Sequence, residues 1–471
     1  MKIFLQRALH RRAVVGFAVG AMAASTPFLA LAREAPVQHE APSPHESTRP
    51  LPYQSKDKTL GVVTCASSLC HGSITEWQGS NIRQNEYVTW LRTDKHAGAA
   101  RVLLNAQSKR IASNLGLKEP PEKSKVCLDC HAHNPSPETA GPRARFIDGV
   151  TCEGCHGPAE TWVASHSLPG ATHEQNVAHG LYPTDRPVER ARLCLSCHFG
   201  NNDRLVTHRM MGAGHPRLSF ELETFTSLAP QHFTIDADYV KRKGAWSGVK
   251  VWAIGQALAV SETMKILTSP TRGRDGIFPE LVVFDCHACH HPMSQLRWTP
   301  VTPFGRSPGP GTPRLNDSSL LMLRAILRVV DPAKAEELTA QTALVHRAAT
   351  GDGDLVSAGR ELGAMAEQAA QQISSTTFDD ATLRGVALAL VDEGLTGQYR
   401  DYAAAEQSVM AIGSVLNYMQ TRGLIQNGAE LNRGLRSIRE PLASDDTYRP
   451  AEFLERLKAF RRLVAETPPL A

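Results

Sequence analysis

The sequence has no long run of basic residues and, beyond its first 32 residues, no excess of either charge. Those 32 residues hold four of the 51 Lys and Arg side chains and none of the 47 Asp and Glu side chains, which leaves 47 of each sign. A nucleic-acid-binding protein needs a basic patch or stripe to neutralise phosphates. The composition therefore predicts no nucleic-acid partner.

The N-terminal segment lacks an apolar run long enough to span a membrane. Its apolar stretch, Ala13 to Ala24, has 12 residues, whereas a spanning helix needs about 20. Basic residues precede this stretch, and the small-residue sequence Ala30 to Ala32 follows it. The pattern predicts a signal peptide at residues 1–32 and a periplasmic or extracellular destination. An uncleaved signal would be the one attachment to a membrane.

Residues 316–471 contain no cysteine and a single histidine, His346. The segment is rich in Ala and Leu at helical spacing, and Asp331 and Asp379 stand where helices should begin. We expect a C-terminal bundle of five to seven helices, acting either as structural support or as a docking or dimerisation module. Residues 299–315, with five prolines and three glycines, predict a linker in front of it.

The ten cysteines are all found between residues 65 and 289. Eight of them form four C-x-x-C-H motifs, the pattern of covalent haem attachment. Two thiols form thioether bonds to the haem, and the adjoining histidine binds the iron. The motifs are Cys127, Cys130 and His131; Cys152, Cys155 and His156; Cys194, Cys197 and His198; Cys286, Cys289 and His290. Zinc ribbons, thioredoxin-like sites and structural disulfides do not explain a histidine after every second cysteine.

The remaining two cysteines stand in "CASSLCH", where four residues separate Cys65 from Cys70 instead of two. Because Cys70 and His71 are still adjacent, two extra residues can bulge away without moving the iron ligand. We assign a fifth haem c here; a disulfide between Cys65 and Cys70 is the alternative. The fold class expected is mainly α: a proline-rich linker at residues 33–60, an irregular multihaem wrap with few strands at 61–298, and the C-terminal bundle. Helices are expected from Asn85 to Leu115 and from Gly248 to Leu267.

Each iron has a second axial position, and more histidines are present than are needed to fill these positions. Residues 61–298 contain ten histidines outside the motif positions: His96, His133, His166, His173, His179, His208, His215, His232, His287 and His291. His208 and His215 are seven residues apart, so a helix would place them on one face, as ligands to two haems. Met210 and Met211 lie between them, and core packing is their expected role.

The stretches "TWLRTDKHAGA" and "GVTCEGCHGPAETWVASH" resemble the cytochrome c-552/c-554 family of multihaem electron carriers, over about residues 61–199. The resemblance implies that His96 is a distal ligand to the haem of His156, and His166 to that of His71. It also implies a ligand upstream of the fourth motif, for which His179 or His173 is the nearest match. In that family the haem of the second motif lacks a distal ligand; here His208 or His215 could supply one.

These features favour an exported pentahaem cytochrome that transfers electrons along closely spaced, mostly bis-histidine haems. The alternative is a multihaem oxidoreductase that acts on a small nitrogen or sulfur compound at one open iron. Pentahaem nitrite reductases mark such an iron with C-x-x-C-K, which is absent here, so a carrier is favoured over an enzyme. The expected partners are other redox proteins, either periplasmic cytochromes or quinol-linked membrane complexes. Oligomerisation would use the C-terminal helices.

If all five motifs carry haem, the intact mass of the mature protein will exceed that of its polypeptide by five haem groups. The reason is that the motifs use every cysteine. Mass spectrometry under denaturing conditions measures this directly. A four-haem mass with a disulfide between Cys65 and Cys70 would contradict the assignment of the first motif.

Overall fold

The computed structural model describes residues 49–79, 82–274, 279–290 and 314–466. The predicted signal peptide, residues 33–48 of the first predicted linker and residues 299–313 of the second lie outside these ranges. Thr48–Ala471 forms one compact unit. The described residues contain helices and turns, with two isolated β-bridges in place of any strand, so the mainly α prediction is confirmed.

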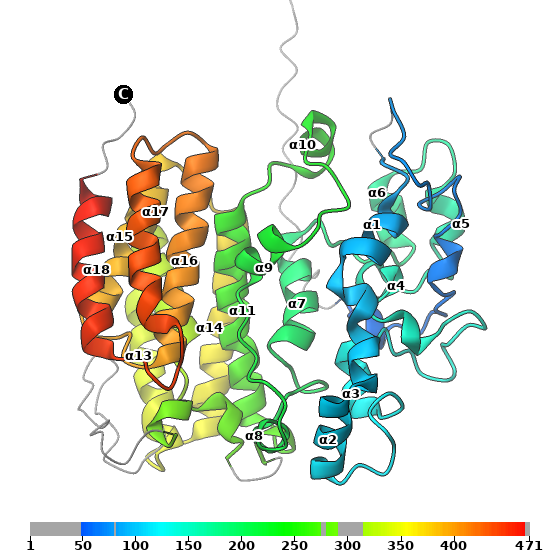
Figure 1. The fold of residues 1–471 in the computed structure, drawn as a ribbon. Helices are drawn as coiled ribbons and strands as arrows, with labels where there is room; N and C mark the ends of the chain where they lie inside the picture. The colour runs from blue at the N-terminus through cyan, green and yellow to red at the C-terminus, as the bar shows by residue number, and fades with distance from the viewer. Residues whose placement is uncertain (1–48, 80–81, 275–278, 291–313, 467–471) are drawn as a thin grey trace, which may run out of the picture. The chain divides into compact units, whose positions relative to one another are not determined.

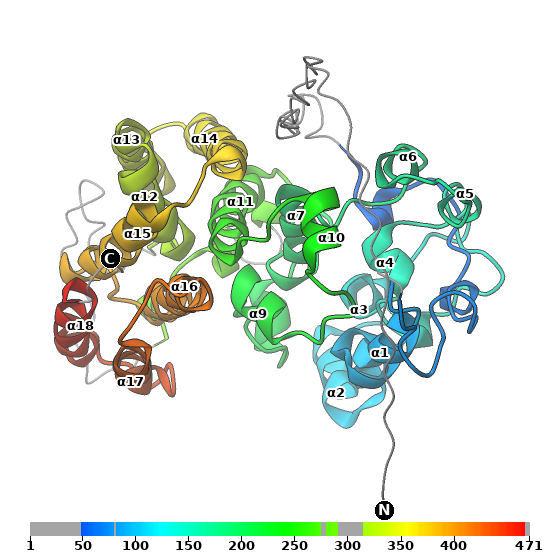
Figure 2. The same cartoon turned by 90° about the horizontal axis from the view of Figure 1, so that it is seen from above.

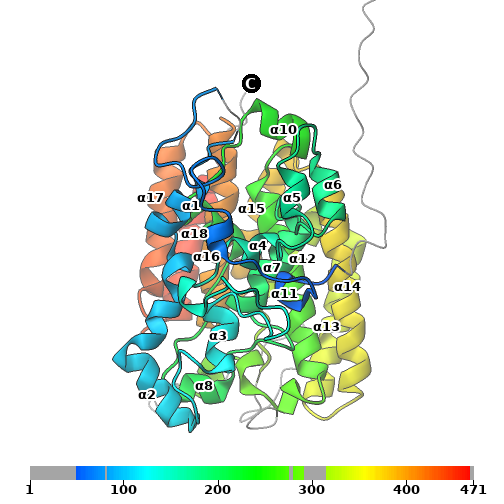
Figure 3. The same cartoon turned by 90° about the vertical axis from the view of Figure 1, so that its right-hand side faces the viewer.

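The part of the chain that carries the haem-attachment motifs is built from short helices (Figure 1; Figure 3). They are α1 (Glu86–Thr93), α2 (Ala106–Leu115), α3 (Lys125–His131), α4 (Cys152–His156), α5 (Val163–His166), α6 (His173–Ala178), α7 (Pro187–His198), α8 (His208–Gly212), α9 (Leu222–Leu228) and α10 (Ala237–Lys243). Helices this short are marginal in isolation. Something other than helix–helix packing must therefore hold many of them.

The prediction of one continuous helix from Asn85 to Leu115 is wrong. The structure has α1, then the 3-10 helix η4 (Lys95–Leu104), then α2. The Asp94 side chain accepts a hydrogen bond from the backbone N–H of His96, and Asn105 accepts one from Ser108. Each of these two side chains starts a new segment, as N-cap residues do. The break turns the chain at His96, one of the candidate ligands.

Helix α11 (Gly248–Thr268) confirms the second predicted helix and is the most buried element of the fold. It packs against α7, which carries the fourth motif, and against α9. It also packs against α12 (Ser318–Val330), α14 (Leu355–Ser375) and α16 (Tyr402–Thr421) (Figure 2). A helix apolar on all sides belongs in a core. Its residues thus connect the motif-bearing segment with the C-terminal bundle.

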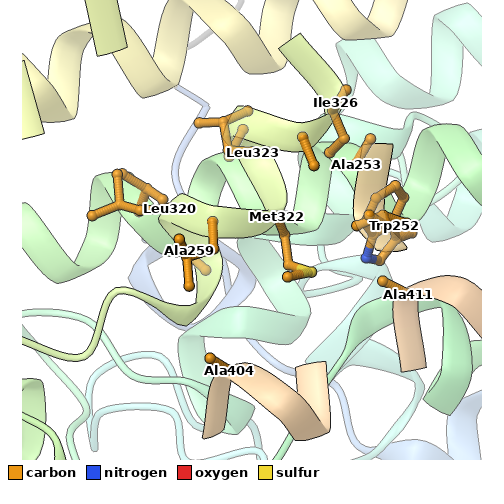
Figure 4. Packing of buried hydrophobic residues seen from close by; sticks show 14 of the residues in the cluster. Trp252, Ala253, Ala259, Leu320, Met322, Leu323, Ile326, Ala404 and Ala411 are labelled. Atoms are coloured by element: carbon orange, nitrogen blue, oxygen red, sulfur yellow. The ribbon is translucent and has the colours of Figure 1, made fainter. Parts of the chain in front are cut away.

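The C-terminal bundle has seven α-helices in the described residues, in agreement with the prediction. Besides α12, α14 and α16 they are α13 (Pro332–Ala349), α15 (Asp380–Leu395), α17 (Gly428–Arg439) and α18 (Pro450–Ala465). Asp331 and Asp379 cap α13 and α15, as predicted. Figure 4 shows Trp252 of α11, Met322 of α12 and Ala411 of α16 within one hydrophobic cluster.

A charged group is buried inside this bundle. Glu393 of α15 is 0% exposed and pairs with Arg324 of α12, which is 2% exposed. Arg328, one turn further along α12, also pairs with Glu393. Charges so deeply buried are tolerated when they are paired.

Replacing Glu393 with alanine should therefore lower the free energy of unfolding by about 3–5 kcal/mol, because it leaves a buried guanidinium without its carboxylate. Guanidinium denaturation followed by circular dichroism measures the loss. The matched control is Glu455→Ala, which removes a carboxylate that is 71% exposed and paired with Lys458. Equal losses of unfolding free energy in the two variants would show that the buried ion pair contributes no more to stability than the exposed one.

Candidate haem-binding sites

The cysteines and histidine of the three central motifs lie on the last turn of a helix. Helices α3, α4 and α7 end at His131, His156 and His198. Residues three and four positions apart share one face of a helix, so both thiols and the imidazole project to the same side. The fifth motif begins a 3-10 helix, η8 (Cys286–Ala288), and the backbone N–H of His290 donates to the Cys286 carbonyl at 2.7 Å.

The first motif keeps a backbone hydrogen bond between its histidine and its first cysteine, despite its two extra residues. The backbone N–H of His71 donates to the Cys65 carbonyl at 3.2 Å, and that of Cys70 donates to Ser67 at 2.9 Å. The extra residues form a bulge whose Leu69 is 78% exposed. Gly72 lies beneath this bulge, where an added Cβ would come within 1.9 Å of the Ala66 carbonyl oxygen. In the structure all ten cysteines are free thiols.

Each motif histidine has a second histidine opposite it. The ring centres are 5.9–6.5 Å apart in the five pairs His71–His166, His96–His198, His131–His215, His156–His232 and His208–His290. Two imidazoles that bind one metal from opposite faces have ring centres about 6 Å apart, because each metal–nitrogen bond is about 2 Å long. The five spacings therefore fit a haem iron between each pair.

Several of these rings are held by their Nδ1 atoms, which leaves Nε2 available for a metal. Nδ1 of His71 lies 2.9 Å from Glu86, and Nδ1 of His96 lies 2.9 Å from Asp94. These carboxylates raise the pKa of both histidines. Nδ1 of three more rings lies within hydrogen-bonding distance of a backbone carbonyl: His131, His166 and His215. Metal-binding histidines usually donate their second N–H in this way.

Three of the remaining candidates have ring nitrogens bonded elsewhere. Nε2 of His133 lies 2.9 Å from the Thr59 hydroxyl, and burial lowers the pKa of His133 to about 4. His173 pairs with Asp185 at 2.9 Å, and Nδ1 of His179 lies 3.0 Å from the Ser165 hydroxyl. His287 lies against Tyr402, and His291 is outside the described residues. Among the described residues, the ring pairs opposite the motif histidines include neither His173 nor His179.

Two further expectations about the candidate ligands differ from the structure. His96 faces His198 instead of His156, because the break at Asp94 turns its ring towards the fourth motif. His208 and His215 do not share a helical face: α8 ends at Gly212, and Gly214 takes a φ of 113° that ends the helical course. Each nevertheless faces a motif histidine of its own.

His232 is the residue that the sequence argument did not select. It faces His156, and burial lowers the pKa of both rings, that of His156 to about 3. A low pKa keeps imidazole neutral, the form that binds metal. No local pattern marks His232; its one signal is its presence among the ten spare histidines.

Apolar groups around the motifs fit a large apolar cofactor. Among the described residues, all large hydrophobic side chains classed as exposed lie between Val63 and Val240, except Leu344 and Val356. The hydrophobic clusters around the first three motifs contain few residues, whereas the main cluster lies in α7, α11 and the bundle. A porphyrin ring would supply the apolar surface that the polypeptide lacks there.

Cysteines of different motifs come into direct contact. A hydrogen bond with Cys152 of the third motif lowers the pKa of Cys65 in the first. A hydrogen bond with Cys130 of the second motif lowers the pKa of Cys197 in the fourth to about 6. Burial raises the pKa of Cys155 to about 12, and neighbouring Cys194 adds to the effect. The first motif therefore lies beside the third, and the fourth lies near both the second and the third.

Comparison with family models finds one match: residues 64–157 match the family described as cytochrome c554 and c-prime. The matched segment contains the first three motifs, together with His96. Comparison with curated proteins and with solved structures gives no match.

His232→Ala should convert one haem from low spin to high spin, because it removes the ring opposite His156. His179→Ala is the matched control and should leave every haem low-spin, since among the described residues its ring is paired with none of the motif histidines. Electron paramagnetic resonance of the oxidised protein distinguishes the two. A high-spin signal in His179→Ala and none in His232→Ala would reverse the assignment.

Proposed function

We propose that this protein, a multihaem c-type cytochrome whose residues 64–157 belong to the cytochrome c554 and c-prime family, is an exported electron carrier with five covalently bound haems. The cysteine pairs of the five motifs would hold the haems, which supply reversible one-electron chemistry. Each motif histidine and the ring opposite it would bind one iron.

The proposal rests on the position of the His215 ring, which lies opposite His131. In the resembling family the haem of the second motif has no distal ligand, and an iron of that kind can bind a small molecule. Here the rings of His131 and His215 are 6.5 Å apart. With both axial positions taken, an iron stays low-spin and its geometry changes little on reduction. Such a site favours electron transfer over catalysis.

The proximity of neighbouring motifs supports electron transfer between them. The cysteine sulfurs of the first motif lie next to those of the third, and those of the second next to those of the fourth. Phe220 stacks on His198 with ring centres 4.6 Å apart, and Phe199 lines the same cavity as Cys286 of the fifth motif. Close approach between neighbouring groups is what electron hopping requires.

Export to the periplasm or cell exterior rests on the pattern of residues 1–32 and on the attachment of haem c. Among the helices of the described ranges, none is both long and apolar enough to cross a membrane. The partners proposed are other redox proteins, periplasmic cytochromes or quinol-linked membrane complexes.

Electron paramagnetic resonance of the oxidised protein with added nitric oxide tests the carrier function. We expect all irons to be low-spin and the spectrum to be unchanged by the gas, because no axial position is left for it. A substoichiometric high-spin signal that the gas abolishes would contradict the proposal. It would favour instead an oxidoreductase that works on a small nitrogen or sulfur compound at one open iron.

A further inference from the structure

A cavity lies between the fifth motif and the C-terminal helices. Cys286 and His287 line it on one side, and Val260 and Met264 of α11 line another. Further lining comes from helices that follow the predicted linker: Ser318, Ser319 and Leu320 at the start of α12, and Tyr402 and Ala403 at the start of α16. Two helices of the bundle thus face the fifth motif.

The histidine pair of the fifth motif is connected to the lining of this cavity through Glu280. His290 and His208 have ring centres 6.2 Å apart. The carboxylate of Glu280, which is 1% exposed, accepts hydrogen bonds from the backbone N–H groups of His208 and of Val282, a lining residue. Neither ring lines the cavity, but Cys286 does, so a porphyrin joined to Cys286 and bound between these two rings would border this cavity.

The chemistry of the lining matches that of haem. The α11 and α12 side chains present apolar surface to a flat apolar ring. Arg217 is the sole Lys or Arg among the described residues that line the cavity, and it is positioned for a carboxylate: it already hydrogen-bonds to Glu406 at 3.1 Å. Its five N–H donors leave capacity for a second carboxylate, such as a haem propionate.

On the basis of the proposed function, we infer that the C-terminal helical region forms one wall of the pocket of the fifth haem. Arg217 would bind a propionate of this haem. The bundle then serves haem binding directly. The haem attached at Cys286 and Cys289 and the first turns of α12 and α16 then cover apolar surface of each other. Haem attachment and the folding of these turns therefore stabilise each other.

A substitution that fills the cavity tests this assignment. Ser319→Trp should remove the low-spin signal of one haem or reduce the haem count by one, because the indole occupies space needed by the porphyrin. The matched control is Ala381→Trp, at the exposed second position of α15, which should keep every low-spin haem. Intact mass and electron paramagnetic resonance measure both. A Ser319→Trp protein with five unchanged haems would overturn the inference.

Hydrogen exchange supplies a second test that does not depend on that substitution. In the full-length protein, Cys286→Ala with Cys289→Ala should speed amide exchange at least about tenfold at the starts of α12 and α16. Cys127→Ala with Cys130→Ala also removes one haem and should leave those amides unchanged. Equal exchange rates in the two variants would contradict the assignment of the C-terminal helices as a pocket wall. They would not contradict the proposed carrier function. Unmodified Cys286 and Cys289 in the wild-type protein would overturn the five-haem proposal as well.

Discussion

The spacing of two imidazoles about one iron is the constraint on which the motif-bearing part of this protein depends. Five pairs of histidine rings, with centres 5.9–6.5 Å apart, connect residues that are far apart in the sequence. Helices such as α4 and α5 are too short to persist alone. Covalent attachment at the cysteines and coordination by histidines from distant loops would hold them in place. This explains how a region with small hydrophobic clusters keeps a defined fold.

Helix α11 has a different role, because it joins this region to a conventional helical bundle. It packs against α7 of the fourth motif and against α12, α14 and α16 of the bundle. A rigid element buried on all sides fixes the position of the groups around it. The fourth and fifth motifs, which lie nearest to α11, are thereby supported by ordinary hydrophobic packing, whereas the first three would depend on the proposed haems.

Much of the local structure could be predicted from particular residues. Asp331 and Asp379 cap the helices that they were expected to start, because an N-cap is a contact within four residues. The apolar sequence from Gly248 to Leu267 predicted a helix for a similarly local reason. The continuous helix from Asn85 to Leu115 failed where Asp94 and Asn105 offered competing caps, a signal present in the sequence but outweighed by the apolar periodicity.

The sequence by itself determined which atoms are proposed to hold haem, since two thiols and a histidine within five to seven residues can form an attachment site through local geometry alone. The tertiary structure decided which histidine stands opposite each of them. It brought His232 to His156 and His96 to His198, and it directed His179 to Ser165. A distal ligand is chosen by the three-dimensional position of one ring nitrogen. That position depends on how distant segments pack, and the residue type does not encode it.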